Sequence, residues 1–236
     1  MWNPLALWAH PGRIWRSLCY QFTGVVVGSV SFPLVVTLLA TSGALLVTFP
    51  LALPVAWLTF VLAHGMAGVE RSRLVSLTGV EATDPTRPLQ RNGWIRRLRD
   101  RVTDFARWRE ILHHLLLLPV SLIGMALVLA VWCGSLALIG LPLYVNGLPG
   151  DSAKFHWFEI TSGPGALAAA GVGLAGLVLV APVVTEAVTW ASAKLARLLL
   201  GPTRGSALAA QLSHLESSRS AAVDSAESER RRSERD

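Results

Sequence analysis

The chain has 236 residues, of which 52% are hydrophobic and only 15% are charged. A soluble domain averages about 25% charged residues, so this composition excludes an ordinary soluble fold and indicates that much of the chain faces lipid. The formal net charge is +6, yet Asp, Glu, Lys and Arg are absent from 17–69, 111–150 and 160–185.

The first uncharged stretch is long enough for two membrane-spanning helices, since one span needs about 20 apolar residues. Pro50 and Pro54 would break a single helix near the middle. The sequence therefore predicts spans at 22–47 and 51–68. A cleaved signal peptide fits poorly, because its apolar core is only about 7–15 residues long.

The next segment, 70–110, is rich in arginine and is expected to lie in the cytoplasm. From Trp94 onward its apolar residues recur at helical spacing, which predicts a basic amphipathic helix on an anionic membrane surface. Nucleic acid is not an expected partner, because the segment is tethered between two spans. The expected partner is the lipid bilayer. The arginines are Arg71, Arg73, Arg87, Arg91, Arg96, Arg97, Arg99, Arg101, Arg107 and Arg109.

The remaining uncharged stretches predict spans at 115–139 and 165–187. The loop between them contains one basic residue, Lys154, and the turn between the first two spans contains none. Because positively charged segments stay in the cytoplasm, we expect a multi-pass protein of the plasma membrane with both termini inside. The two cysteines, Cys19 and Cys133, have no disulfide or metal-site spacing and are expected to be apolar fillers.

A weak internal repeat relates the two halves of the chain. Trp15 and Arg16 precede the first span, and Trp108 and Arg109 precede the third. These four residues are predicted anchors at the membrane interface. The repeat predicts two parallel hairpins that both start on the cytoplasmic side.

Parallel repeats also occur in transporters, which usually carry ionisable groups deep in the membrane. The candidates here are His64 and Glu186, and both are predicted near the cytoplasmic ends of their spans, as are His113 and His114. The alternative is that these side chains only extend to the membrane–water interface and have no role in transport or signalling. Glu186, which follows Pro182, is also a candidate for signal coupling.

The outer loop, 145–164, is too short to fold as a ligand-binding domain. It contains the candidate sensing residues His156, Trp157 and Glu159, although a plain connection is the alternative. A stimulus would therefore act in the bilayer, at this loop or through a partner protein.

The segment 201–236 follows a transmembrane domain of 1–200 and is rich in Ala, Ser, Glu and Arg. Leu208, Leu212 and Leu215 share one helical face with two later alanines, which predicts a thin coiled coil and a homodimer. These leucines are candidate signal-coupling residues. A disordered polar tail is the alternative.

The stretch 218–224 (SRSAAVD) and the ending 229–236 (ERRRSERD) resemble the linker before the phosphoacceptor box of actinobacterial sensor histidine kinases. The Trp-Arg pairs, the spans and the Arg-rich insert also resemble the membrane sensor module of that family. The resemblance implies a dimer that autophosphorylates on histidine, with ATP and Mg²⁺, and passes phosphate to a response regulator.

The residues that would perform this chemistry are not in the chain. The family's Leu-His-Asp-Gly box would follow Asp236, and His214 lies upstream of it. We therefore assign no catalytic, cofactor-binding or metal-binding residue. The sequence favours the sensor and transmission part of a histidine kinase, truncated before the box. A stand-alone four-span protein, either a small transporter or a scaffold for a partner, is the alternative.

Overall fold

The computed structural model describes residues 8, 10–48, 50–79, 94–147, 152–155, 158–161, 163–201 and 218–220. Its four long apolar helical stretches are Pro11–Thr48, Ala52–Thr78, Phe105–Gly147 and Pro164–Leu200, and each is long enough to cross a membrane. The prediction of a helical membrane protein with four candidate spans is confirmed. The linker lies outside the described residues except for Gly201 and 218–220, so its coiled coil stays a prediction.

The first hairpin consists of α2 (Pro11–Ala44), the 3-10 turn η1 (Leu45–Thr48) and α3 (Ala52–Thr78). The predicted second span ended at 68, but α3 continues to Thr78 and ends at Gly79, whose φ of 69° forms a left-handed cap. α3 therefore includes residues 70–78, which are predicted to belong to the cytoplasmic segment. Its charged turn stays helical because Glu70 and Arg73 pair one turn apart.

The second half begins with α4 (Trp94–Thr103), which confirms the helix predicted from Trp94 onward. Asp104 then separates α4 from α5 (Phe105–Tyr144), and its carboxylate accepts a 3.0 Å hydrogen bond from the amide of Ala106. α5 extends beyond the predicted span at both ends.

The connection between α5 and α6, which is predicted to be the outer loop, contains secondary structure of its own. The 3-10 turn η2 (Val145–Gly147) is followed by an antiparallel hairpin of β1 (Ser152–Phe155) and β2 (Phe158–Thr161). Ala153 of this hairpin packs in a buried cluster with residues of α5 and α6. The chain returns through α6 (Pro164–Ala175), the π-helical turn η3 (Gly176–Val180) and α7 (Ala181–Leu200).

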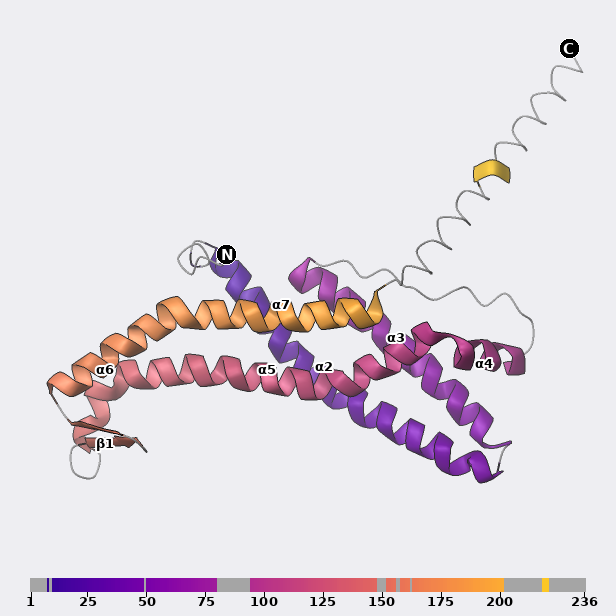
Figure 1. Cartoon of the computed structure of the whole chain (residues 1–236), viewed down its shortest axis with the longest axis horizontal. Coiled ribbons are helices and arrows are strands. Elements are labelled where there is room, and N and C mark those ends of the chain that lie inside the picture. Colours follow the sequence, from indigo (N-terminus) through magenta and orange to yellow (C-terminus); the bar gives the residue numbers. More distant parts are fainter. Residues whose placement is uncertain are drawn as a thin grey trace, which may run out of the picture.

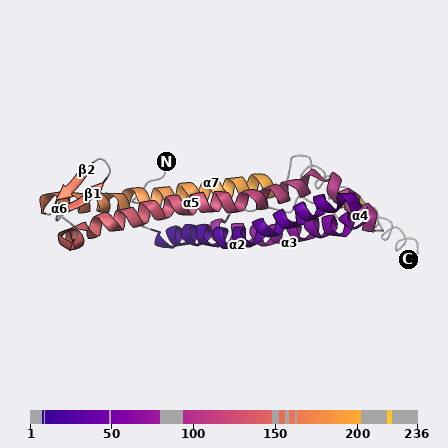
Figure 2. The same cartoon turned by 90° about the horizontal axis from the view of Figure 1, so that it is seen from below.

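The two hairpins form two layers, α2 with α3 and α5 with α7 (Figure 2). Where the layers meet, α2 and α5 run antiparallel: a Cβ built on Gly28 would lie 3.0 Å from the Cα of Leu118, and one built on Gly124 would lie 3.1 Å from the side chain of Gln21. At Gly28 the neighbouring atom belongs to the backbone, so a side chain there would force the two helices apart. The α2–α3 turn and the β-hairpin therefore point to opposite ends of the molecule (Figure 1).

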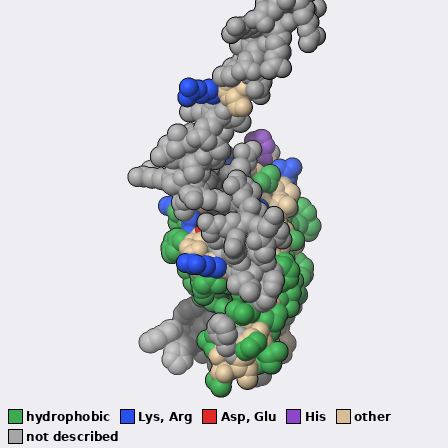
Figure 3. All heavy atoms as spheres, turned by 90° about the vertical axis from the view of Figure 1, so that its right-hand side faces the viewer, with side chains coloured by type: hydrophobic (Ala, Val, Ile, Leu, Met, Phe, Trp, Pro, Cys, Tyr) green, Lys and Arg blue, Asp and Glu red, His purple; other side chains and the backbone are tan. Residues whose placement is uncertain are grey.

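Large apolar side chains cover the outside of the helices. Phe22, Ile123, Leu167 and Val172 are all more than half exposed, and hydrophobic side chains dominate the described face in Figure 3. Polar side chains, by contrast, are buried between the helices. An apolar outer surface with ionisable groups facing the inside of the bundle is the arrangement expected of helices in lipid.

The antiparallel packing differs from the predicted parallel repeat. α4 contacts α3 close to the α2–α3 turn, where the Arg101 guanidinium lies 5.5 Å from the centre of the Trp57 ring. The predicted orientation places α4 and this turn on opposite sides of the membrane. The parallel repeat is not seen in the structure. The orientation of the chain in the membrane stays a prediction.

Cross-linking discriminates between the two arrangements. In a chain with Cys19 and Cys133 replaced by alanine, cysteines at positions 57 and 101 are expected to react with a short bifunctional reagent, because their parent side chains are in contact. The control pair is 57 and 197, which should not react: Leu200 lies beside Arg71, about 20 Å along α3 from position 57. No 57–101 product above the control would contradict the packing of α4.

Candidate functional site

Charged and aromatic side chains meet between α2, α3 and α5, next to the end of α7, and we call this set the polar junction. It consists of Tyr20, His64, Glu70, Arg71, Arg73, Glu110, His113 and His114. All except His64 are buried. Buried charges are costly in apolar surroundings unless they are paired, so the arrangement of these groups decides how the helices pack.

The first part of the junction is a bidentate ion pair within α3. The Nε of Arg73 donates to one Glu70 oxygen at 2.8 Å, and a terminal nitrogen donates to the other. The same guanidinium donates to the backbone oxygen of Tyr20 at 2.6 Å and lies 4.1 Å from the centre of its ring. Arg73 therefore ties α3 to α2 through a charge, a carbonyl and an aromatic face.

The second part is centred on Glu110 of α5. Its carboxylate accepts hydrogen bonds from Arg71 at 2.6 Å and from the Nδ1 of His64 at 3.0 Å, both on α3. Arg107, one turn earlier on α5, lies 3.5 Å from the same carboxylate. One buried carboxylate thus joins three basic groups from two helices.

Two adjacent histidines fill the space between these ion pairs. The Nε2 of His114 donates to the backbone oxygen of Ala63 at 3.0 Å. His113 lies 3.9 Å from Glu70, and neither of its ring nitrogens has a hydrogen-bond partner among the described residues. It borders a cavity of about 10 Å³ together with Gln21 and Ser121. That volume fits about one water molecule and is far too small for a drug-sized ligand.

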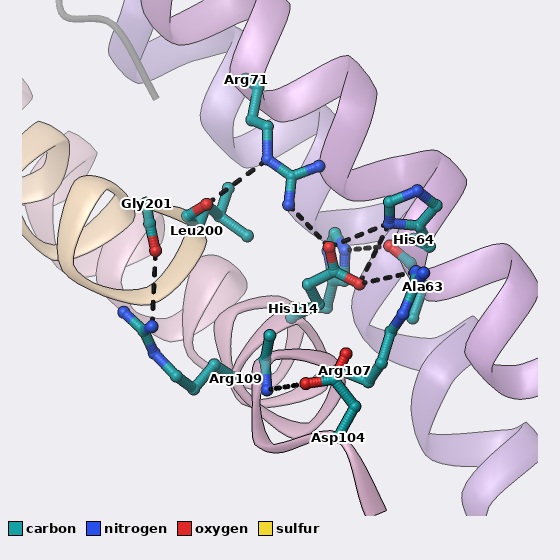
Figure 4. Close-up of polar contacts among 11 residues, drawn as sticks. Ala63, His64, Arg71, Asp104, Arg107, Arg109, His114, Leu200 and Gly201 are labelled. Atoms are coloured by element: carbon teal, nitrogen blue, oxygen red, sulfur yellow. Dashed lines mark hydrogen bonds and ion pairs between the residues drawn. The ribbon is translucent and has the colours of Figure 1, made fainter. Parts of the chain in front are cut away.

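The junction also reaches the end of α7 (Figure 4). Arg71, which binds Glu110, directs its Nε at the backbone oxygen of Leu200, 3.4 Å away. Arg109 of α5 contacts the backbone oxygen of Gly201 at the same distance. The last carbonyls of a helix have no partner within the helix and carry partial negative charge, so two guanidinium groups stabilise this end.

Glu186 lies in a separate contact between α7 and the start of α2. Its carboxylate accepts hydrogen bonds from Ser17 at 2.8 Å and from Arg13, with an ion-pair distance of 3.0 Å. One turn further along, Gln21 donates to Thr189 at 3.3 Å. The candidate coupling residue is therefore buried at a helix contact and does not extend to the surface.

The other predicted site residues are not brought together. Trp15 and Arg16 are exposed, and Trp108 is half-exposed against Phe60, so their role as interface anchors stays a prediction. His156, Trp157, Leu208, Leu212 and Leu215 lie outside the described residues, and only the backbone of Glu159 is described, in β2.

The sequence indicated His64, His113 and His114 near the cytoplasmic ends of their spans, but not that they meet Glu70, Arg71 and Arg73. These three residues are predicted to belong to the arginine-rich cytoplasmic segment. The available signal was the spacing of Ala67, Leu74 and Leu77, which are seven and three residues apart and place Glu70 and Arg71 on the same helical face. Among the described residues, no group of three or more His, Cys, Asp or Glu could hold a metal ion.

A family model named Sensor, with the description "Putative sensor", matches residues 14–200. The comparison with curated proteins and that with solved structures gave no match. The matched range extends from the first turn of α2 to the last residue of α7 and includes the whole polar junction. The chain belongs to the Sensor family, whose domain is a sensor module often found in histidine kinases.

Proposed function

We propose that this chain is the sensing and signal-transmission module of a two-component histidine kinase. It would couple a stimulus in the membrane or envelope to a cytoplasmic kinase through the helix that follows α7. The observation that carries the proposal is the contact of Arg71 with the carbonyl of Leu200, the last residue of α7, and of Arg109 with the carbonyl of Gly201, which follows it. Any change in the packing of α3 or α5 would act directly on the segment that leaves the domain.

The mechanism is a shift between two packings of the same helices. Glu110 holds Arg71, and Arg71 holds the end of α7, so a stimulus that separates α3 from α5 would also release α7. A ligand or membrane state can move such an equilibrium only by its differential interaction with the two packings. A coupling free energy of about 1–3 kcal/mol is enough for a useful switch.

The kinase context rests on the Sensor family and on the resemblance of the C-terminal segment to kinase linkers. In this proposal the chain works as a homodimer in the plasma membrane, with both termini in the cytoplasm. ATP, Mg²⁺ and the response regulator would be bound by the kinase that the module controls. A small transporter is less well supported, because the buried charges of the junction are paired with one another.

The proposal predicts that the arginines at the end of α7 set the signalling output. In a fusion of this chain to an intact histidine kinase, Arg71→Met and Arg109→Met are expected to shift the unstimulated autophosphorylation rate about fivefold or more. Arg109→Met removes the contact with the Gly201 oxygen, whereas Arg71→Met removes the contact with Leu200 and also breaks the ion pair with Glu110. Phosphate incorporation in proteoliposomes measures the shift.

The matched control is Arg99→Met, since Arg99 is exposed on α4. Arg99→Met should leave the autophosphorylation rate within about twofold of that of the unsubstituted fusion, because exposed charges contribute little to helix packing. If Arg71→Met and Arg109→Met both leave the output at the level of the control in a folded fusion, α7 is not the output element held by the junction.

A further inference from the structure

The fourth span contains a break in its backbone hydrogen bonding. Within η3, the amide of Ala181 donates to the oxygen of Gly176, five residues earlier, which makes the turn π-helical. Pro182 follows at once and has no amide hydrogen, so it cannot donate to Val178, four residues earlier. A carbonyl without a partner in apolar surroundings costs several kcal/mol, so a span tolerates such a break only where another group supplies the donor.

That donor comes from the start of the chain. The indole nitrogen of Trp8 donates to the backbone oxygen of Val178 at 2.8 Å, across 170 positions of sequence. Its ring lies 6.4 Å from that of Trp132 on α5. Trp132 in turn donates to the hydroxyl of Thr185 at 3.0 Å, and this hydroxyl donates to the oxygen of Ala181. Two tryptophans therefore surround the break.

The break separates two parts of the span that are held differently. α6 packs closely on α5: a Cβ on Gly173 would lie 2.7 Å from the oxygen of Ser135. α7 is held by α2 through Glu186 and by the arginines at its end. A π-turn followed by proline is a common place for a helix to bend. The residues between Gly176 and Pro182 are where a movement of one part relative to the other would be absorbed.

We propose that Trp8 is a latch on a hinge in the fourth span, and that its release lets α6 bend relative to α7. The latch supplies the hydrogen bond that Pro182 cannot make, so the N-terminal segment controls the flexibility of the span that leads to the C-terminus. The inference concerns the bending of one helix and does not depend on a kinase.

The test measures amide hydrogen exchange of the 236-residue chain in nanodiscs. Trp8→Phe keeps a ring and removes the N–H, and it is expected to raise exchange at residues 176–184 about fivefold, the effect of losing one hydrogen bond. Trp108→Phe is the matched control: its indole also donates to a carbonyl, that of Val102 at 2.8 Å, and it is 43% exposed against 38% for Trp8. The control should leave 176–184 unchanged.

A second variant tests the cause. Pro182→Ala returns an amide hydrogen to the position that can donate to Val178, so Trp8→Phe should have little effect when combined with it. The latch is supported if Trp8→Phe loosens 176–184 alone and Pro182→Ala suppresses that effect. It is overturned if Trp8→Phe changes nothing there, if it speeds exchange throughout the four helices, or if the effect persists in the double variant.

Discussion

Replacing Glu110 by alanine is expected to lower the free energy of unfolding by about 3–5 kcal/mol. The carboxylate is buried and neutralises Arg71, with His64 and Arg107 also within 3.5 Å. Removing it leaves buried positive charge without its counterion, and this loss costs far more than the net value of an intact pair. Unfolding of the purified chain in mixed detergent micelles, followed by circular dichroism, measures the change.

Two further variants show whether charge burial is the cause. Arg99→Ala removes an exposed charge from α4 and should change stability by less than about 0.5 kcal/mol. Glu110→Ala combined with Arg71→Ala should recover part of the loss, because the double variant no longer buries the Arg71 charge. Equal losses for Glu110→Ala and Arg99→Ala would show that the junction contributes no more than a surface contact.

The second large effect is expected at the contact of α6 with α5. Gly173→Ala should destabilise the chain by about 1–3 kcal/mol, the usual cost of overpacking. The added Cβ would lie 2.7 Å from the Cβ of Leu138 and from the oxygen of Ser135, and 2.9 Å from the amide of Ile139. Two of these atoms belong to the backbone, so the helices must move apart. The same detergent unfolding assay measures the loss.

Gly171 supplies a matched control in the same helix. A Cβ at this position meets nothing within 4 Å, so Gly171→Ala changes only helix propensity. It is expected to leave stability unchanged or raise it by up to about 1 kcal/mol. If Gly173→Ala is as harmless as Gly171→Ala, the close approach of α6 to α5 is not what holds the second hairpin together.

The candidate spans were predictable because they depend on composition alone. Runs of apolar residues near Val35, Leu127 and Val172 are long enough to cross a bilayer whatever their neighbours are. The helix from Trp94 was predictable for a similar reason, since its spacing is local. Helix ends were less predictable: α3 extends past residue 68 because Glu70 and Arg73 neutralise each other within the helix.

Only the tertiary structure decided which charges are partners. Glu110 and Arg71 are 39 positions apart, and Trp8 and Val178 are 170 apart. Hydropathy and periodicity indicate which face of each helix lies against lipid and which lies against protein. They do not indicate which other helix packs against that face. The antiparallel approach of α2 and α5 depends on Gly28, whose missing side chain matters only once a second helix is in contact. The sequence by itself determined the membrane class and its four candidate spans, whereas the polar junction exists only because packing brings distant charges into an environment where they must pair.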